Sequence, residues 1–390
     1  MTLIFDDQST DLGTHALLIG VGDYPYLKGG SAPAQLFVHH MEMGQLSSPP
    51  ISVQEMASWL SDPVSGMLNT ARPLRSLEVL GSSSTTPQML VLPGRPDTPL
   101  QRASMVNVEE AVATWMERAG RNTGNTLLFF FCGHGISYSL GESSLLLDDF
   151  GSNPLMPMAH AIDFDTFRFG LIRRCAAENQ VFFLDACRTE MATAFERQFG
   201  DANKGIPIVT GGGGLSAIRN KAVPVFFATG LGSLAYGQPG EPTIFTQGLL
   251  RAFRGSASRE ASNNGWEVVA TAITEGVNKC VESLAFQKIP QYCDSKDANR
   301  PLLLHRLRGK PEVVVKVTTS EEQLNDTLFS CESKPPPPLF TDKRIPPGKA
   351  PWWIHLPAGQ YTFTAVSHRS SLLIGSCEKH VAPPASEVTL

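Results

Sequence analysis

The sequence lacks the long apolar and the long basic segments that mark several classes of protein. None of its apolar runs approaches the roughly 18 residues that a membrane helix needs. Residues 1–7 (MTLIFDD) are acidic where a signal peptide would be basic. With a formal net charge of -5 and scattered basic residues, the 390-residue chain also lacks an extended positive field. We therefore expect a cytoplasmic protein whose partners include neither nucleic acid nor a membrane.

The chain is also poor in the residue clusters that hold metals and cofactors. Its seven cysteines are dispersed, and none forms the Cys-x-x-Cys pair typical of zinc and dithiol sites. Cys132 and His134 stand close in the sequence, but no third and fourth ligand lies at useful spacing. Asp148 and Asp149 alone are too few for a calcium site. We expect reduced thiols, no bound metal and no cofactor.

The glycine-rich segments do not carry a nucleotide-binding signature. Gly211 to Gly214 lack the Lys-Ser/Thr ending of a phosphate-binding loop and the spacing of a dinucleotide fingerprint. A mobile loop is the expected structure of this segment. The chain also has no internal repeat.

Short apolar runs alternate with amphipathic stretches from residue 15 to about residue 305. Apolar runs predict strands at residues 15–21, 74–80, 125–132, 180–184 and 223–229. Amphipathic stretches predict helices at residues 51–60, 107–119, 165–177 and 266–286. Asn107 and Glu110 stand at capping-box spacing, which predicts that the second helix begins there. Strands separated by helices indicate an α/β fold with a mostly parallel sheet and helices on both faces.

The composition changes after Pro311. Short alternating runs separated by Pro and Gly turns predict strands at residues 313–318, 352–356, 361–366 and 372–375. We therefore expect a small β-sandwich over residues 311–390, after an α/β domain over residues 1–310. Trp352 and Trp353 are interpreted as sandwich core in preference to an exposed recognition patch.

Two strands of the predicted sheet end abruptly in reactive residues. Residues 127–137 (LLFFFCGHGIS) end at His134 between two glycines, and residues 181–190 (VFFLDACRTE) end at Asp185 and Cys187. Because the carboxyl ends of parallel strands lie along one edge of a sheet, these two tips are expected to meet. Either residue alone would more often be a structural histidine or a buried thiol. Their joint occurrence after apolar strands favours a catalytic pair.

A cysteine and a histidine at one edge suit acyl transfer. The thiolate is the nucleophile, and an imidazole takes the thiol proton and later returns it to the leaving amine. The backbone N–H groups of Gly135 and Cys187 are the expected oxyanion donors, because glycine lets the backbone approach closely.

These motifs resemble the caspase clan, which includes caspases, metacaspases and paracaspases. The resemblance rests on Gly-His134-Gly135 after one strand and Asp185-Ala-Cys187-Arg188 after another. The opening strand ALLIGVGDYPYL and the stretch FFATGLGSLAYG are also similar to bacterial caspase-like proteins. The resemblance covers roughly residues 14 to 305. It implies a six-stranded sheet, with a large-subunit-like part at 1–200, a loop at 200–222 and a small-subunit-like part at 223–310.

The resemblance assigns roles to four residues. His134 would be the general base and acid, Cys187 the nucleophile, Gly135 an oxyanion donor and Asp185 a substrate-binding residue. Asp185 stands two positions before the cysteine, where metacaspases and paracaspases have an aspartate in a pocket for Arg or Lys. An acidic pocket favours a cationic side chain, so cleavage after Arg or Lys is expected.

The chain departs from the metacaspase pattern at one place. Metacaspases usually supply a second pocket acid shortly after the first strand, but residues 27–33 (LKGGSAP) contain none. Four residues stay open as substitutes: Asp23, Asp163, Asp165 and Glu241. The role of Arg188, structural or substrate-contacting, is open as well.

Regulation and partners follow from the resemblance. Caspases are often cut between their two subunits, and the corresponding loop here offers Arg197, Lys204, Arg219 and Lys221. Self-cleavage and an intact loop are both open. The C-terminal sandwich is expected to recognise a protein partner or substrate, or to restrain the protease. A role in bacterial defence or programmed death is implied. The competing functions are a catalytically silent scaffold and another cysteine hydrolase or acyltransferase.

Overall fold

The computed structural model describes residues 2–37, 40, 42–84, 87–139, 142–188, 204–211, 221–262, 265–284, 291–334 and 338–390. They form two compact units, Met1–Gln247 with Pro290–Leu302, and Gly248–Ile289 with Leu303–Leu390. The division at residue 310, which follows a change in composition, stays a prediction. None of the described helices is long and apolar enough to cross a membrane.

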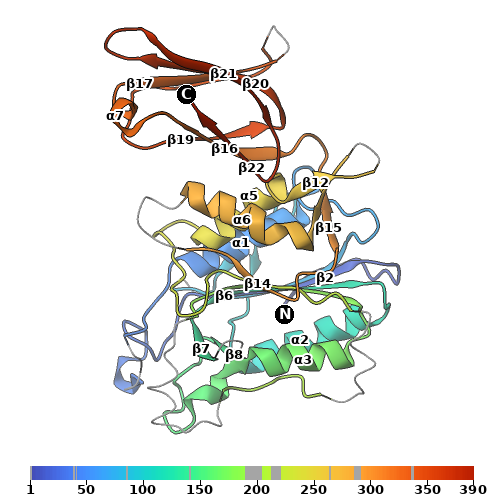
Figure 1. Cartoon of the computed structure of the whole chain (residues 1–390). Helices are drawn as coiled ribbons and strands as arrows, with labels where there is room; N and C mark the ends of the chain where they lie inside the picture. The colour runs from blue at the N-terminus through green and yellow to red at the C-terminus, as the bar shows by residue number, and fades with distance from the viewer. Residues whose placement is uncertain are drawn as a thin grey trace. The chain divides into compact units, whose positions relative to one another are not determined.

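The first unit is built on a seven-stranded sheet (Figure 1). Its order is β1 (Leu3–Asp6), β3 (Leu74–Ser82), β2 (Thr14–Val21), β6 (Thr126–Gly133), β10 (Asn179–Ala186), β11 (Val225–Phe227) and β14 (Asp294–Lys296). The five inner strands are parallel, and the two edge strands are antiparallel to their neighbours. The inner strands are the five that the apolar runs predict, so the expected mainly parallel α/β sheet is confirmed.

The sheet has seven strands in the described part of the chain, where six were expected. The edge strand β1 is four residues long, and the edge strand β14 is a three-residue segment with the polar sequence DSK. An edge strand can be polar because solvent covers its open side, so a search for apolar runs does not detect it.

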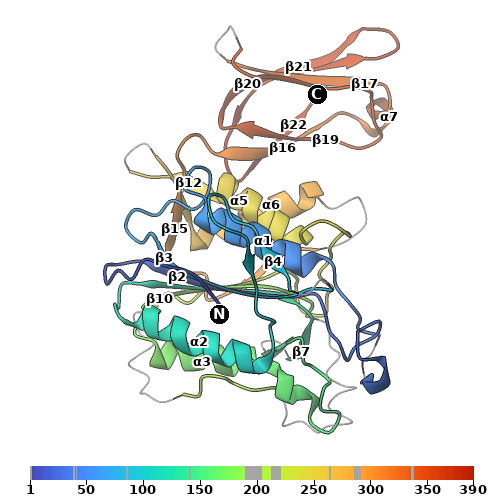
Figure 2. The same cartoon turned by 180° about the vertical axis from the view of Figure 1, so that it is seen from behind.

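Helices cover both faces of this sheet (Figure 2). Helix α1 (Ser48–Ser61) lies on one face, and α2 (Met105–Gly120) and α3 (Phe164–Arg174) lie on the other. All eight residues of β2 and of β6 are buried, as expected for strands packed on both sides. Phe129, Phe167 and Phe182 form one buried aromatic cluster under α3. Full burial of each ring contributes about 1.5–3 kcal/mol.

Helix α2 begins earlier than its sequence suggests, and its predicted capping box is wrong. The helix starts at Met105, and the side chain of Asn107 donates to the carbonyl of Arg102. The Asp149 carboxylate, 44 positions away, accepts the N–H of Met105 instead. A cap supplied by a distant residue leaves no local sequence pattern.

The helix predicted at 266–286 begins as a strand. Residues Trp266–Val269 form β13, which pairs with β12 (Ser258–Glu260) and β15 (Leu303–Arg306), and α6 follows over Ala270–Leu284. Pairing on both sides overrides the helical pattern of these four residues. Helix α5 (Ile244–Arg254) precedes them and had not been predicted.

A small sheet follows β6 directly. It consists of β7 (Gly135–Ser139), β8 (Glu142–Leu146) and β9 (Ala161–Asp163). Ile206 bridges to Ile162 at its edge. A two-stranded ribbon, β4 (Met89–Leu90) with β5 (Thr98–Pro99), lies between β3 and α2 in the sequence. The turn from β6 into β7 places His134 between two sheets.

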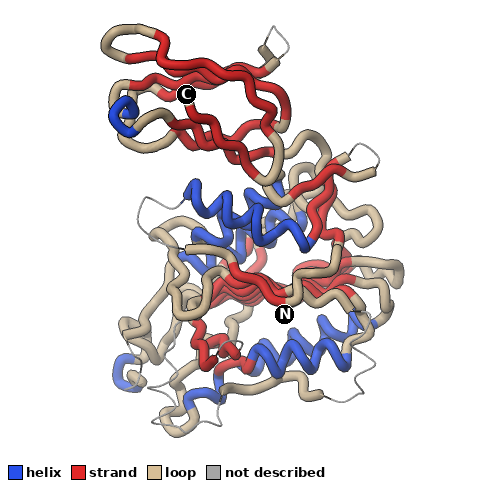
Figure 3. Tube along the Cα trace, viewed as in Figure 1, coloured by secondary structure: helices blue, strands red, loops and turns tan. Residues whose placement is uncertain are grey.

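The C-terminal residues form the expected β-sandwich (Figure 3). One sheet has the order β19 (Trp352–Pro357), β16 (Glu312–Thr318) and β22 (Ala385–Thr389). The other has the order β18 (Thr341–Arg344), β17 (Thr327–Ser333), β20 (Gly359–Ser367) and β21 (Leu373–Val381), and a short helix α7 spans Glu321–Leu324. Trp352 is buried in the core against Phe329, as expected, whereas Trp353 is only half-buried.

Candidate active site

A cavity of about 210 Å³ opens at the carboxyl ends of β6 and β10. His134, Cys187 and Asp185 all line it. The remaining lining residues come from three segments: Gln45 to Pro49, Cys132 with Gly133, and Ala235, Tyr236, Gly237, Pro239 and Thr243. The three side chains that the sequence singles out therefore share one cavity.

Strand register explains why His134 and Cys187 line the same cavity. Strands β6 and β10 are parallel, and Ala186 pairs with Gly133. The next residue along each strand is Cys187 on one side and His134 on the other. The two reactive residues are therefore register neighbours at one edge of the sheet.

His134 is held by its backbone and by its ring. Its N–H donates to the Tyr24 hydroxyl at 2.8 Å, and its Nε2 lies 2.8 Å from the Gly44 carbonyl oxygen. A carbonyl oxygen only accepts, so Nε2 carries the ring proton and Nδ1 is left as the acceptor. Burial lowers the pKa of His134, against the opposing effect of the Gly44 carbonyl. The resting imidazole is neutral and ready to take a proton on Nδ1.

Cys187 rests as a thiol. Burial raises the pKa of Cys187, while the N–H of Ala235, 3.3 Å from Sγ, acts in the opposite direction. A thiol with a raised pKa has little thiolate at neutral pH, so its reactivity depends on a base. The acceptor nitrogen of His134 is the candidate base in this cavity.

Glycine is needed on both sides of His134. A Cβ at Gly135 would lie 2.8 Å from the Cys187 carbonyl oxygen and 2.9 Å from the Ala186 Cβ. A Cβ at Gly133 would lie 2.8 Å from the Tyr24 hydroxyl oxygen. The backbone of Gly135 is thus packed closely against that of Cys187, although Gly135 itself does not line the cavity. Its role as an oxyanion donor stays a prediction.

Asp185 lies at the buried side of the cavity, with only 2% of its surface exposed. Its Oδ2 accepts hydrogen bonds from the hydroxyls of Thr243 and Thr246, at the start of α5. Its Oδ1 is buried and has no N–H or O–H donor among the described residues. Burial raises the pKa of Asp185 to about 6, although the two threonines and the Cys132 thiol lower it. The hydroxyl donors thus gather on Oδ2, and the role of Asp185 as a substrate-binding residue stays a prediction.

None of the four candidates for a second pocket acid lines the cavity, and Glu241 is exposed. The other three are bonded elsewhere: Asp23 to Arg102, Asp163 to Thr166, and Asp165 to Lys296. Asp185 is the single acidic side chain in the described lining.

Arg188 has structural contacts. Its guanidinium pairs with Asp294 on β14 at 2.7 Å and lies 4.1 Å from the ring centroid of Phe227 on β11. It does not line the cavity. The arginine thus ties the end of β10 to the edge of the sheet. Within the described ranges, no three His, Cys, Asp or Glu side chains are grouped to hold a metal ion.

Sequence motifs did not identify Tyr24, Gly44 or Ala235 as members of the site. Gly44 and Ala235 act through backbone groups, which have no side-chain signature. Tyr24 does lie in the stretch ALLIGVGDYPYL, which the family resemblance includes. Its position next to Asp23, just after the end of β2, was the signal that could have identified it.

Comparison with known proteins identifies the family of the chain. The family model described as Caspase domain matches residues 14–300. The chain belongs to the caspase-domain family. The predicted resemblance and caspase-like fold are confirmed, and the domain is that of a caspase-like protease.

Two further proteins are similar to parts of the chain. The uncharacterized protein y4kE of Sinorhizobium fredii (strain NBRC 101917 / NGR234) is 29% identical over 301 residues, which are 72% of this chain and 81% of that protein. The crystal structure of caspase-1 from Spodoptera frugiperda aligns with a TM-score of 0.42 and 10% identity, over 77% of this chain and 95% of that chain.

Proposed function

We propose that the chain is a cysteine endopeptidase that cleaves protein substrates after Arg or Lys. The observation that carries this proposal is the placement of His134, Cys187 and Asp185 around one cavity, at register-adjacent strand ends. The family assigns the general class, and the cavity supports the roles of these residues.

The proposed reaction uses two neutral groups. Nδ1 of His134 takes the Cys187 proton as Sγ attacks the scissile carbonyl carbon. The N–H groups of Gly135 and Cys187 stabilise the negative oxygen of the tetrahedral intermediate. The intermediate collapses to a thioester, and the amine leaves with the proton from His134. Water, deprotonated by the same nitrogen, then hydrolyses the thioester and restores the thiol.

The proposed specificity rests on Asp185. Its free Oδ1 is a buried acceptor that a substrate ammonium or guanidinium group would satisfy by a charge-assisted hydrogen bond. A substrate aspartate would place a second carboxylate beside the first, which is unfavourable. The two threonine hydroxyls on Oδ2 orient the carboxylate within the cavity.

A peptide panel tests this function. The wild-type chain should cleave peptides with Arg or Lys before the scissile bond, and Cys187→Ala or His134→Ala should lose about a thousandfold or more in kcat/KM. Cys377→Ala, which removes a half-buried thiol of the sandwich, is the matched control and should keep full activity. Cleavage after Asp alone would contradict the pocket assignment. A wild-type chain that cleaves no peptide and has an unreactive Cys187 would support the scaffold function instead.

Self-processing within residues 200–222 or just before them is part of the proposal. Lys204 pairs with Glu142, and the Lys221 ammonium donates to the Cys175 carbonyl. Arg197 and Arg219 lie outside the described residues, as do Gly212 to Gly214. Because the described lysines are already bonded, we expect cleavage after an arginine. Intact-mass measurement of wild type and Cys187→Ala tests this, and identical single-chain masses would rule it out.

The remaining assignments come from the composition, for the location, and from the family resemblance, for the pathway and the C-terminal sandwich. We place the protease in the cytoplasm, in a bacterial defence or cell-death pathway. We assign recognition of a protein partner, or restraint of the protease, to the C-terminal sandwich. Deletion of residues 311–390 should then change the response of the protease to its protein partner. The deletion leaves the proposed catalytic residues Cys187 and His134 in the chain.

A further inference from the structure

Tyr24 contacts His134 in two ways. This tyrosine is fully buried, and its hydroxyl accepts the His134 N–H at 2.8 Å while donating to the Leu146 carbonyl at 3.3 Å. Its ring centroid lies 4.8 Å from that of the imidazole. The phenol thus joins the end of β6 to β8 and packs against the histidine ring. Tyr24 constrains both the backbone and the side chain of His134.

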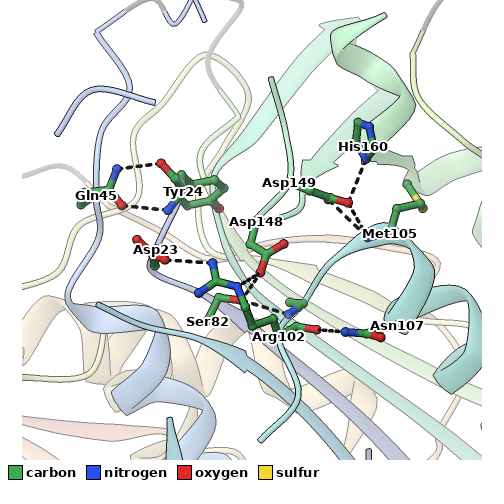
Figure 4. A network of polar contacts seen from close by, with 11 residues as sticks. Asp23, Tyr24, Gln45, Ser82, Arg102, Met105, Asn107, Asp148, Asp149 and His160 are labelled. Carbon is green, nitrogen blue, oxygen red and sulfur yellow. Dashed lines mark hydrogen bonds and ion pairs between the residues drawn. The ribbon is translucent and has the colours of Figure 1, made fainter. Parts of the chain in front are cut away.

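Gln45 holds Tyr24 from the other side (Figure 4). Its Oε1 accepts the Tyr24 N–H at 2.8 Å, and its Nε2 donates to the Tyr24 carbonyl at 2.9 Å. The same Nε2 also donates to the Lys28 carbonyl at 3.2 Å. A primary amide has both a donor and an acceptor, so it can bind both backbone groups of one residue. Gln45 thereby joins the segment after β2 to the segment before α1.

The residue next to Gln45 supplies the contact to the imidazole. Gly44 precedes Gln45, and its carbonyl oxygen is the partner of His134 Nε2. Backbone bonds from Lys28 to Met43 and from Leu46 to Gly22 hold the same two segments together. The direction of the Gly44 carbonyl therefore depends on how firmly Gln45 is fixed to Tyr24.

An ion-pair network supports the residue before Tyr24. Asp23 pairs with Arg102 at 2.8 Å, and Arg102 also pairs with the buried Asp148 at 2.8 Å. Asp148 in turn accepts a hydrogen bond from Ser82 at the end of β3 (Figure 4). The tyrosine is thus fixed by Gln45 on one side and by this network on the other.

We propose that Tyr24 and Gln45 are positioning residues that keep the His134 proton on Nε2 and the ring directed so that Nδ1 meets the Cys187 thiol. This role rests on the proposed function of His134 as a base. A free imidazole rotates and exchanges its ring proton between two nitrogens, and the wrong form cannot accept the thiol proton. Misplacement of a catalytic group costs about tenfold to a hundredfold in rate.

Three variants test the proposal in the full chain. Tyr24→Phe removes only the hydroxyl, and Gln45→Ala removes both contacts to Tyr24. Gln54→Ala is the matched control: Gln54 on α1 binds the N–H and the carbonyl of Val91 in the same way but does not line the cavity. We expect kcat to fall about tenfold to a hundredfold in the first two variants and to stay unchanged in the third. KM should change little in Tyr24→Phe, since Tyr24 does not line the cavity.

Thiol chemistry gives a readout that needs no peptidase activity. The rate of Cys187 alkylation by iodoacetamide, followed on its peptide by mass spectrometry, reports how well His134 assists the thiol. In Tyr24→Phe and Gln45→Ala, the alkylation rate of Cys187 near pH 7 should fall. The pH at which this rate increases should be higher than in the wild type. Nitrogen chemical shifts of labelled histidine should show the ring proton leaving Nε2.

The outcomes separate the positioning role from the proposed function. If both variants keep the kcat and the alkylation profile of Gln54→Ala, the positioning role is wrong. If the wild type cleaves no peptide but both variants still change the alkylation profile, the positioning role stands and the peptidase function fails. Should Gln45→Ala not fold, Gln45→Glu serves instead. It keeps an acceptor for the Tyr24 N–H but loses the donor to its carbonyl, so an intermediate loss is expected.

Discussion

The two sides of the cavity follow the same pattern in the sequence but differ in how they are held. At the end of β6, His134 is surrounded by neutral groups, the Tyr24 hydroxyl and the Gly44 carbonyl. At the end of β10, Asp185 is a buried carboxylate with two hydroxyl donors on one oxygen, and the described residues place no N–H or O–H donor on the other. This difference fits the two roles that we propose, proton transfer on the histidine side and recognition of a cationic side chain on the aspartate side.

A side chain added between the two strand ends should have the largest effect on kcat/KM. Gly135→Ala places a Cβ 2.8 Å from the Cys187 carbonyl oxygen, so the tips of β6 and β10 must separate. We expect kcat/KM to fall about a hundredfold to a thousandfold, because the oxyanion donor moves. Gly309→Ala, where an added Cβ meets nothing within 4 Å, is the control in steady-state assays. Equal activity of the two variants would contradict a role for the Gly135 backbone.

Removal of the Asp185 charge should affect substrate recognition but not the reactivity that depends on His134. Asp185→Asn keeps the shape of the side chain but loses the carboxylate, so kcat/KM for Arg and Lys peptides should fall about thirtyfold or more. Alkylation of Cys187 should be at least as fast as in the wild type, because the Asp185 charge raises the pKa of Cys187 and the substitution removes that charge. The two measurements together distinguish recognition from catalysis. A slower alkylation with unchanged specificity would reverse the assignment of the two sides.

Acid should weaken recognition through Asp185. With the pKa of Asp185 at about 6, most of this carboxyl group is protonated at pH 5. KM for a Lys peptide should therefore rise about tenfold between pH 7.5 and pH 5. In Asp185→Asn this rise should disappear, as measured from full kinetic profiles. A wild-type KM that stays constant over this range would contradict the role of Asp185.

The same raised pKa has a consequence for stability. The folded-state pKa of Asp185 lies above its ordinary value of 3.8, so the folded state binds the proton more tightly than the unfolded state. Ionisation of Asp185 thus lowers the free energy of unfolding as pH rises from about 4 to about 6. The Tm of Asp185→Asn relative to wild type should increase over this window. An unchanged difference in Tm would mean that Asp185 ionises freely in the folded protein.

The smallest effect is expected on the histidine side, through Arg102. Arg102→Met removes both ion pairs, to Asp23 and to Asp148. Burial already raises the pKa of Asp148, so this carboxyl can take up a proton when its partner is lost. We expect kcat to fall about twofold to fivefold with specificity unchanged. Arg75→Met, which breaks the ion pair to Asp7, is the control. An equal fall in kcat in both variants would contradict a role of Arg102 in supporting Tyr24.

Much of the fold was predictable because burial leaves a local pattern. The inner strands are covered on both faces, so they appear as continuous apolar runs, and His134 and Cys187 stand out because each interrupts such a run. The polar edge strand β14 has no such pattern. The cap of α2 by Asp149 and the strand at Trp266–Val269 depend on partners distant in the sequence.

The sequence by itself determined the five inner strands of the sheet and the residue types that lie at its carboxyl edge. Only the tertiary structure decided which nitrogen of His134 faces the Gly44 carbonyl and which oxygen of Asp185 accepts the two threonine hydroxyls. The contacts of Tyr24 with His134 and of Gln45 with Tyr24 also appear only there. The physical reason is that apolar burial is encoded in side-chain types along the chain. Hydrogen bonds to backbone groups such as the Gly44 carbonyl depend on chain direction, which appears only once the segments have packed together.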